Sequence, residues 1–445
     1  MLINKNNLYA SLSILLSLFF YFSILDHLPN SQKAAISTLV LAICFWVLEI
    51  VPLYVTGFIA SFLLMLSGEF SGQDIFYPYF DPVIVLFLGG FVLALGMQNQ
   101  SLDKRMANFI IHRSGSKPSH FLLVLMLVTA FLSMWMSNTA ATAIMIPIAL
   151  SLLKQSGYDA SKDNFCKLTV LAVAYSATLG GIGTLIGSPP NAIAAKYMLD
   201  AGMELSFIDW ILKSLPFVAL ALIVTWRILL YKAKDLKEAI ELNPEQYSTF
   251  TKEQKVVIIV FVLTVALWLT TKLTGFSSSM IALLPVILFS FTGIINETDI
   301  QKISWSTLLL FGGGLSLGSA MIQSGADKTI VNASIEFWHN LPLLAFNIAL
   351  VFFSVLVTMI ASNTASAAIL IPMLLPLTSQ LPVSSFNLVY LIAVGVSLDF
   401  MMPMGTPPSA IAYSTGIVRV KEMVKIGFII NLTTGLLLSL YVYLF

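Results

Sequence analysis

The tetrapeptide Ser-Asn-Thr-Ala occurs twice in this chain, at residues 137–140 and 362–365, each time inside a long apolar stretch. Serine, asparagine and threonine supply small hydrogen-bond donors and acceptors without a formal charge. Where one helix ends and another begins, free N–H groups can bind an anion and free carbonyl groups can bind a small hard cation. Because the tetrapeptide is duplicated, we interpret it as two halves of one binding site rather than as helix-packing or capping residues.

A second duplicated motif, with two adjacent prolines, follows each polar cluster. Gly-Ser-Pro-Pro-Asn-Ala-Ile-Ala at 187–194 corresponds to Gly-Thr-Pro-Pro-Ser-Ala-Ile-Ala at 405–412. Adjacent prolines cannot continue a helix, and they release the carbonyl groups upstream of them. Broken helices at membrane depth are tolerated where they line a cavity, so we expect both loops to border the site. A third pair, Leu-Phe and Gly-Gly within 86–90 and 310–314, occurs in the same order.

The duplicated motifs contain no lysine, arginine or histidine. A dianion buried without a counter-charge is strongly unfavourable, so cations from solution are expected to enter with it. Sodium is favoured because hydroxyl, amide and carbonyl oxygens are hard ligands. Two carboxylates lie within predicted spans. For Asp399, which lies before the second proline loop, a role in binding a cation or proton and a structural role both stay open. For Glu49 we favour a structural role.

The composition requires elements that cross a membrane. The chain is 58% hydrophobic and 10% charged, with a mean hydropathy of +0.91. We therefore predict an all-α polytopic membrane protein with apolar runs of about 20 residues as transmembrane helices. The eleven predicted spans are 8–25, 34–51, 53–68, 82–99, 166–186, 208–230, 255–273, 278–295, 305–323, 386–403 and 425–444.

Two further apolar stretches, 121–153 and 343–378, carry the polar clusters near their centres. A straight helix of either length would overshoot a bilayer of about 30 Å, so we predict two re-entrant helical hairpins. With the N-terminus in the cytoplasm, this topology places eighteen of the 23 lysines and arginines inside. The segments 101–114 and 324–338 are predicted to lie along the two membrane interfaces.

The order of the motifs predicts an inverted repeat, which is typical of secondary transporters. We divide the chain into an N-terminal helix (1–33), a first repeat (34–231), a cytoplasmic linker (232–254) and a second repeat (255–445). An intramembrane enzyme is not expected, because the sequence lacks a second deep aspartate, a His-Glu-x-x-His motif and a membrane histidine. No nucleic-acid partner is expected either.

These motifs resemble the divalent anion/sodium symporter family, whose members carry dicarboxylates, citrate or sulfate. The resemblance covers nearly the whole chain, including Glu-Ile-Val-Pro at 49–52 and Ser-x-x-Phe-x-x-Pro-Met-Gly at 397–405. Three residues depart from the family pattern: Ser409 stands where asparagine is usual, Ala412 where valine is usual, and Asp399 where a small or apolar residue is expected. These departures fall in the second half of the site.

The resemblance implies a homodimer in the plasma (inner) membrane, with a scaffold domain and a transport domain that moves like an elevator. It implies that the substrate contacts Ser137, Asn138, Thr139, Ser188, Ser362, Asn363, Thr364, Thr406 and Pro407. It places one sodium ion among Ser133, Ser137, Asn138 and Gly187, and a second among Thr358, Ser362, Asn363 and Gly405. The expected function is sodium-coupled symport of C4-dicarboxylates such as succinate, malate and fumarate. Sodium-independent dicarboxylate exchange, sulfate or citrate transport and a proton-coupled variant stay open.

Overall fold

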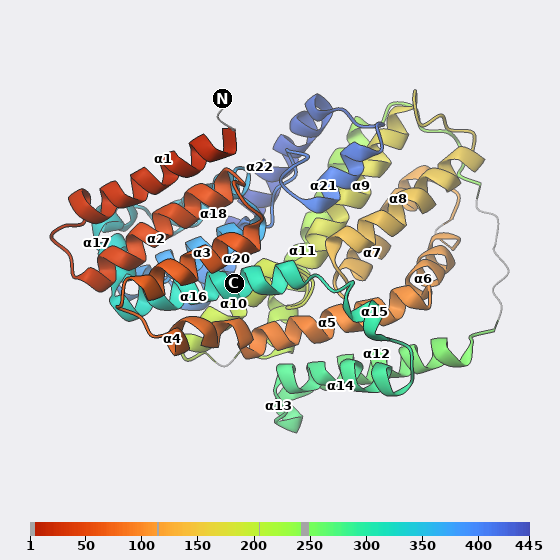
Figure 1. Ribbon diagram of the computed structural model, residues 1–445. Coiled ribbons are helices and arrows are strands. Elements are labelled where there is room, and N and C mark those ends of the chain that lie inside the picture. Colours follow the sequence, from red (N-terminus) through yellow and green to blue (C-terminus); the bar gives the residue numbers. More distant parts are fainter. Residues whose placement is uncertain (1–4, 114, 204, 242–248) are drawn as a thin grey trace.

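The computed structural model describes residues 5–113, 115–203, 205–241 and 249–445, and every regular element in them is a helix (Figure 1). The predicted all-helical class is confirmed for this part of the chain. Helices satisfy their backbone hydrogen bonds internally, as an apolar chain in lipid must do. Residues 1–4 of the predicted N-terminal segment, 114 and 204 of the first repeat, and 242–248 of the linker lie outside the described residues.

In chain order the helices are α1 (Lys5–Phe19), η1 (Phe20–Ile24), α2 (Asn30–Val47), α3 (Leu53–Leu66), α4 (Gly72–Phe76), η2 (Tyr77–Phe80), α5 (Pro82–Asn99), α6 (Leu102–Ile111), α7 (Pro118–Ser133), α8 (Asn138–Gln155), α9 (Asn164–Gly181), α10 (Pro189–Asp200), α11 (Phe207–Lys232), α12 (Lys252–Leu269), α13 (Thr271–Thr274), α14 (Ser278–Phe291), α15 (Glu297–Ile300), α16 (Trp305–Ser324), α17 (Ala326–His339), α18 (Leu343–Thr358), α19 (Asn363–Leu374), η3 (Leu375–Ser379), α20 (Ser385–Gly395), α21 (Pro407–Ser414) and α22 (Val420–Leu444).

Each predicted span overlaps a helix, but several of these helices, among them α9, α14 and α20, end earlier than predicted. α9 ends at Gly181 and α20 ends at Gly395, so the backbone leaves the helix well before the paired prolines. Within the described residues, six helical segments are long and apolar enough to cross a membrane. They are Asn6–Ile24, Asn30–Val47, Gly72–Asn99, Phe207–Lys232, Trp305–Ser324 and Val420–Leu444. The full number of crossings stays a prediction.

The two long stretches that carry the polar clusters are each divided into two helices. α7 and α8 meet at the first cluster, and α18 and α19 meet at the second. The predicted interfacial segments form α6 and α17, which lie at opposite ends of the bundle (Figure 1). Each of these helices begins after a residue with left-handed backbone, Ser101 (φ 51°) or Gly325 (φ 74°), where the chain turns sharply.

Small residues allow the helices around the site to approach closely. A methyl group added to Gly57 of α3 would lie only 3.0 Å from the Cα of Gly313 in α16. A methyl group on Gly89 of α5 would collide with the carbonyl oxygen of Ala282 in α14. Backbone contact of this kind is a common way for helices to pack in lipid. It fixes α5 and α16, which form one wall of the site described below.

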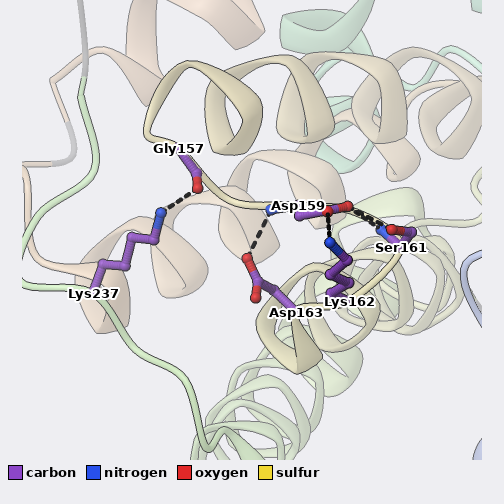
Figure 2. A network of polar contacts seen from close by, with 6 residues as sticks. All are labelled: Gly157, Asp159, Ser161, Lys162, Asp163 and Lys237. Atoms are coloured by element: carbon purple, nitrogen blue, oxygen red, sulfur yellow. Dashed lines mark hydrogen bonds and ion pairs between the residues drawn. The ribbon is translucent and has the colours of Figure 1, made fainter.

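The turn between α8 and α9 is held by a network of polar contacts (Figure 2). The Asp159 carboxylate accepts hydrogen bonds from the backbone N–H (2.9 Å) and hydroxyl (2.6 Å) of Ser161, and the carboxylate of Asp163 accepts from the Asp159 N–H (2.7 Å). Lys237, beyond the end of α11, donates to the Gly157 carbonyl. This turn therefore links the hairpin, the first broken helix and the segment after α11.

Candidate functional site

The two polar clusters have the same local geometry. Ser137 is the N-cap of α8, and its hydroxyl accepts a hydrogen bond from the Ala140 N–H at 3.2 Å. Ser362 caps α19 in the same way, accepting from the Ala365 N–H at 3.2 Å. A serine N-cap satisfies only one of the N–H groups of the first helical turn. The remaining N–H groups and the positive end of the helix dipole can serve a ligand.

Behind each cluster, a hydroxyl from the preceding helix holds the asparagine. Ser133 Oγ lies 2.6 Å from Asn138 Oδ1, and Thr358 Oγ1 lies 2.7 Å from Asn363 Oδ1. Both hydroxyl residues are fully buried. The duplication in sequence is thus also a duplication in hydrogen bonding, with the bonded hydroxyl five residues before the asparagine in each half.

The first asparagine lies among oxygen atoms. The side-chain atom nearest to Ser133 is also 3.2 Å from the carbonyl oxygens of both Ala177 and Gly187. These distances suit an amide nitrogen that donates to both carbonyls. If the amide is turned so that its oxygen lies at this place, the oxygens of Ser133, Asn138, Ala177 and Gly187 would instead surround a small cation. Of the residues predicted to bind the first sodium ion, Ser133, Asn138 and Gly187 lie together here, while the Ser137 hydroxyl caps α8; their role in binding sodium stays a prediction.

The break between α9 and α10 is stabilised by one asparagine. The amide nitrogen of Asn191 donates to the carbonyl oxygens of Gly181 (2.8 Å) and Thr184 (2.7 Å), with a longer contact to Ile182 (3.4 Å). The indole N–H of Trp210 also donates to the Ile182 carbonyl at 2.9 Å. Carbonyl groups released by the broken helix are thereby satisfied without water.

The break between α20 and α21 is built differently. Ser409 occupies the position that corresponds to Asn191, and its short side chain accepts from Thr406 Oγ1 at 3.0 Å instead of reaching the upstream carbonyls. A different residue, Asn431 of α22, accepts from the Phe400 N–H at 3.1 Å. The second loop therefore lacks the hydrogen bonds that Asn191 makes in the first loop.

A cavity of about 500 Å³ lies between the two clusters and the two proline loops. All nine residues predicted to contact substrate line it: Ser137, Asn138, Thr139, Ser188, Ser362, Asn363, Thr364, Thr406 and Pro407. Gly187 and Gly405 line it as well. The N-termini of four helices, α8, α10, α19 and α21, therefore converge on one cavity. Four partial positive charges directed at one cavity favour an anion.

The opposite wall of the cavity comes from α5, α16 and the start of α3, and these residues were not predicted from the sequence. They are Leu53, Phe87, Phe91, Ala94, Leu95, Gln98, Thr307 and Leu310. The third duplicated motif could have indicated this wall, because it contains Phe87. This residue and its counterpart Phe311 meet edge to face, with ring centroids 5.2 Å apart. This apolar wall would exclude water from one side of the cavity.

One charged side chain, Lys302, also lines the cavity, which the sequence motifs did not indicate. Its Nζ forms an ion pair with Asp299 Oδ1 at 2.8 Å, and the lysine side chain is 61% exposed. The hydrogen bond from Lys302 holds the pKa of the Asp299 carboxyl below its ordinary value. The lysine thus lies at the mouth of the cavity, engaged by a carboxylate, while the interior residues are neutral.

The two predicted membrane carboxylates have different environments. Glu49 lies exposed in the turn between α2 and α3, with left-handed backbone (φ 47°), and it does not line the cavity, so its structural role stays a prediction. Asp399 is fully buried in the unwound segment between α20 and α21. It lies directly against Gly405, a residue of the cavity wall.

Comparison with protein families matches residues 4–445 to the transmembrane region of the sodium:sulfate symporters. The chain is 34% identical over 468 residues to an uncharacterized transporter of Haemophilus influenzae, covering 99% of this chain and 97% of that protein. It is 33% identical over 432 residues to the sodium-dependent dicarboxylate transporter SdcS of Staphylococcus aureus, covering 89% and 83%.

Two solved transporter structures share the fold at low sequence identity. The YdaH transporter of Alcanivorax borkumensis has a TM-score of 0.56 and 13% identity, over 84% of this chain and 87% of that one. MtrF of Neisseria gonorrhoeae has a TM-score of 0.57 and 12% identity, over 83% and 82%. These likenesses concern the arrangement of the helices alone.

Proposed function

Since this chain belongs to the sodium:sulfate symporter family, we propose that it is a sodium-coupled symporter of C4-dicarboxylates such as succinate, malate and fumarate. The name of the relative SdcS, a sodium-dependent dicarboxylate transporter, supports this choice within the family. Both relatives are named as transporters, which supports a transporter rather than an enzyme.

One observation carries the proposal: four helix N-termini and uncharged hydroxyl and amide groups surround a single cavity. The positive ends of the helices attract the carboxylates of the substrate, and the serine and threonine hydroxyls donate hydrogen bonds to them. Removing two negative charges from water is unfavourable by several kcal/mol per charge. Because the interior groups are neutral, positive ions must enter with the substrate.

Two clusters of oxygen atoms supply the places for sodium. We assign the first to Ser133, Ser137, Asn138 and Gly187, and the second to Thr358, Ser362, Asn363 and Gly405, beside the substrate cavity. The support is the matching geometry of the clusters, in which a buried hydroxyl orients each asparagine. Sodium bound in both places would offset the charge of the dianion and order the hairpin tips before the substrate arrives.

We propose that the site moves across the membrane as part of a transport unit made of α7–α11 and α18–α22. Helices α1–α5, α12, α14 and α16 would form the stationary scaffold, and two chains would assemble through it as a homodimer. The two hairpins, each re-entrant from one side, would close over the site in turn, as in other transporters with inverted repeats. The protein would lie in the plasma membrane with its N-terminus in the cytoplasm.

The direct test is uptake of radiolabelled succinate into proteoliposomes, with an inward sodium gradient or with choline in place of sodium. We expect uptake only with sodium, rising with more than the first power of its concentration, and inhibition by excess malate or fumarate. Uptake that is independent of sodium but is stimulated by succinate inside the vesicles would identify a dicarboxylate exchanger instead. Competition by sulfate or citrate, without competition by malate, would identify another substrate of the family.

A further inference from the structure

The carboxylate of Asp399 is buried without a compensating charge. Its side chain is 0% exposed, and neither oxygen makes a hydrogen bond of ordinary geometry, although the backbone N–H groups of Met401 and Met402 lie near it. Among the ion pairs of the described residues, none includes Asp399. An unpaired carboxylate in the membrane interior is strongly unfavourable, so such residues commonly bind an ion.

The internal duplication relates the surroundings of Asp399 to those of a known position in the first half. Aligning the two proline loops places Asp399 at the position of Gly181 in the first half. A methyl group on Gly187 would lie 2.6 Å from the Gly181 carbonyl oxygen, and one on the corresponding Gly405 would collide with Asp399 Oδ2. The same two positions are therefore in contact in both halves of the molecule.

In the first half, that position faces the asparagine of the hairpin tip. A methyl group on Gly181 would collide with Asn138 Oδ1, within the cluster of oxygens that we assign to the first sodium ion. By the internal duplication, we infer that the equivalent place in the second half lies beside the cluster of Thr358, Asn363 and Gly405, of which Gly405 contacts Asp399 directly. Asp399 thus places a carboxylate at the position where the first half has only Gly181, next to the proposed sodium cluster.

The other polar groups near Asp399 carry no positive charge. The Tyr175 hydroxyl interacts electrostatically with Asp399 and has no hydrogen-bond partner in the described part of the chain. Asn431 Nδ2 also lacks a partner there, while Asn431 Oδ1 accepts from the Phe400 N–H. Ser409, in place of the asparagine of the first half, leaves the carbonyls of the second loop without an equivalent donor.

We propose that Asp399 is a carboxylate ligand of a sodium ion bound at the second cluster, which makes the two cation sites of this chain unlike in charge. The first site uses neutral oxygens alone, and the second adds a full negative charge. This inference rests on the proposed sodium-coupled transport. Because of the Asp399 charge, the second site should hold its sodium ion more tightly than the neutral first site does.

The consequence can be measured as charge. Asp399 travels with the protein in both directions, so over a full cycle only the sodium ions and the dianion contribute to the net charge moved. Removing the aspartate charge weakens the second site, so its sodium ion no longer accompanies each dianion. We therefore expect Asp399→Asn to carry one positive charge fewer with each dianion than the unmodified protein does.

The experiment measures the reversal potential of succinate transport in proteoliposomes across a series of sodium gradients, which gives the sodium-to-succinate ratio. We expect the ratio to fall by one in Asp399→Asn. The matched control is Asp327→Asn, the same change at another buried carboxylate, which lies in the first turn of α17 and outside the cavity wall. Its ratio should equal that of the unmodified protein.

Equilibrium binding of radioactive sodium to the purified, monodisperse variants covers the case in which Asp399→Asn binds but does not transport. We expect one site fewer, or at least a tenfold weaker site, in Asp399→Asn alone. Unchanged sodium binding and an unchanged ratio would overturn the inference while leaving the proposed function intact. A loss of pH dependence with unchanged sodium coupling would assign Asp399 to a proton and also overturn it. No sodium dependence in the unmodified protein would overturn the proposed function and this inference together.

Discussion

Ser133 and Thr358 contribute to the site from behind the cavity rather than from its wall. Each is fully buried, and each forms a hydrogen bond with the asparagine of its own hairpin tip. Neither hydroxyl residue is among those that line the cavity. Removing these hydroxyls leaves the lining of the cavity unchanged, so on the proposed assignment it should weaken sodium binding more than substrate binding.

We predict that Ser133→Ala and Thr358→Val each raise the sodium concentration for half-maximal uptake by about tenfold, the effect of losing about 1.4 kcal/mol of binding free energy. At saturating sodium, the KM for succinate should be nearly unchanged. The control is Thr129→Val in the same helix as Ser133, because the Thr129 hydroxyl donates only to the Leu125 carbonyl one turn earlier. A raised succinate KM with unaltered sodium dependence would contradict the assignment.

Lys302 lines the cavity and could in principle neutralise the substrate in place of sodium ions, but its geometry argues against this role. Its Nζ is engaged by Asp299, and the side chain is mostly exposed at the cavity mouth. Exposed ion pairs contribute at most about 1 kcal/mol, so Lys302→Gln should raise the succinate KM by no more than about fivefold. This increase should shrink as choline chloride is added. A hundredfold loss at every ionic strength would show that the lysine itself neutralises the substrate.

At the scale of helices, Asn191 stabilises the break between α9 and α10. Its amide satisfies carbonyls of Gly181, Ile182 and Thr184, and leaving buried carbonyls unsatisfied costs about 1–3 kcal/mol. We predict that Asn191→Asp, which keeps the size but cannot donate when charged, lowers the melting temperature by at least about 2 °C and abolishes uptake. The exposed Asn340→Asp provides the control and should leave both unchanged. A fully stable and active Asn191→Asp would show that the released carbonyls do not need this donor.

The motifs predicted the elements of the site better than its boundaries. The polar clusters mark where the second helix of each hairpin begins, so α8 and α19 start where expected, whereas the helices α10 and α21 that begin at the paired prolines were not predicted. The ends of α9 and α20 depend on glycine packing and on hydrogen bonds from distant residues such as Trp210 and Asn431, which no local pattern reveals. For the same reason Lys302 was not predicted, since its approach to the site follows from how α16 packs.

At the scale of the whole molecule, the distribution of lysine and arginine predicts which end of the bundle faces the cytoplasm. Lys162 follows α8 near one end, and Lys328 lies in α17 at the other; both are exposed. In a background without Cys44 and Cys166, we predict that a membrane-impermeant maleimide labels Lys162→Cys only in inside-out vesicles. Lys328→Cys should react only in intact cells. Labelling of both from one side would refute the predicted topology.

The account depends on a neutral cavity that holds a dianion only together with positive ions. The most direct measurement is the affinity of the purified protein for succinate by titration calorimetry, with sodium replaced stepwise by choline at constant ionic strength. Because binding of each ion assists the other, we expect the dissociation constant to rise at least a hundredfold as sodium is removed. An affinity that stays the same without sodium would contradict the central claim.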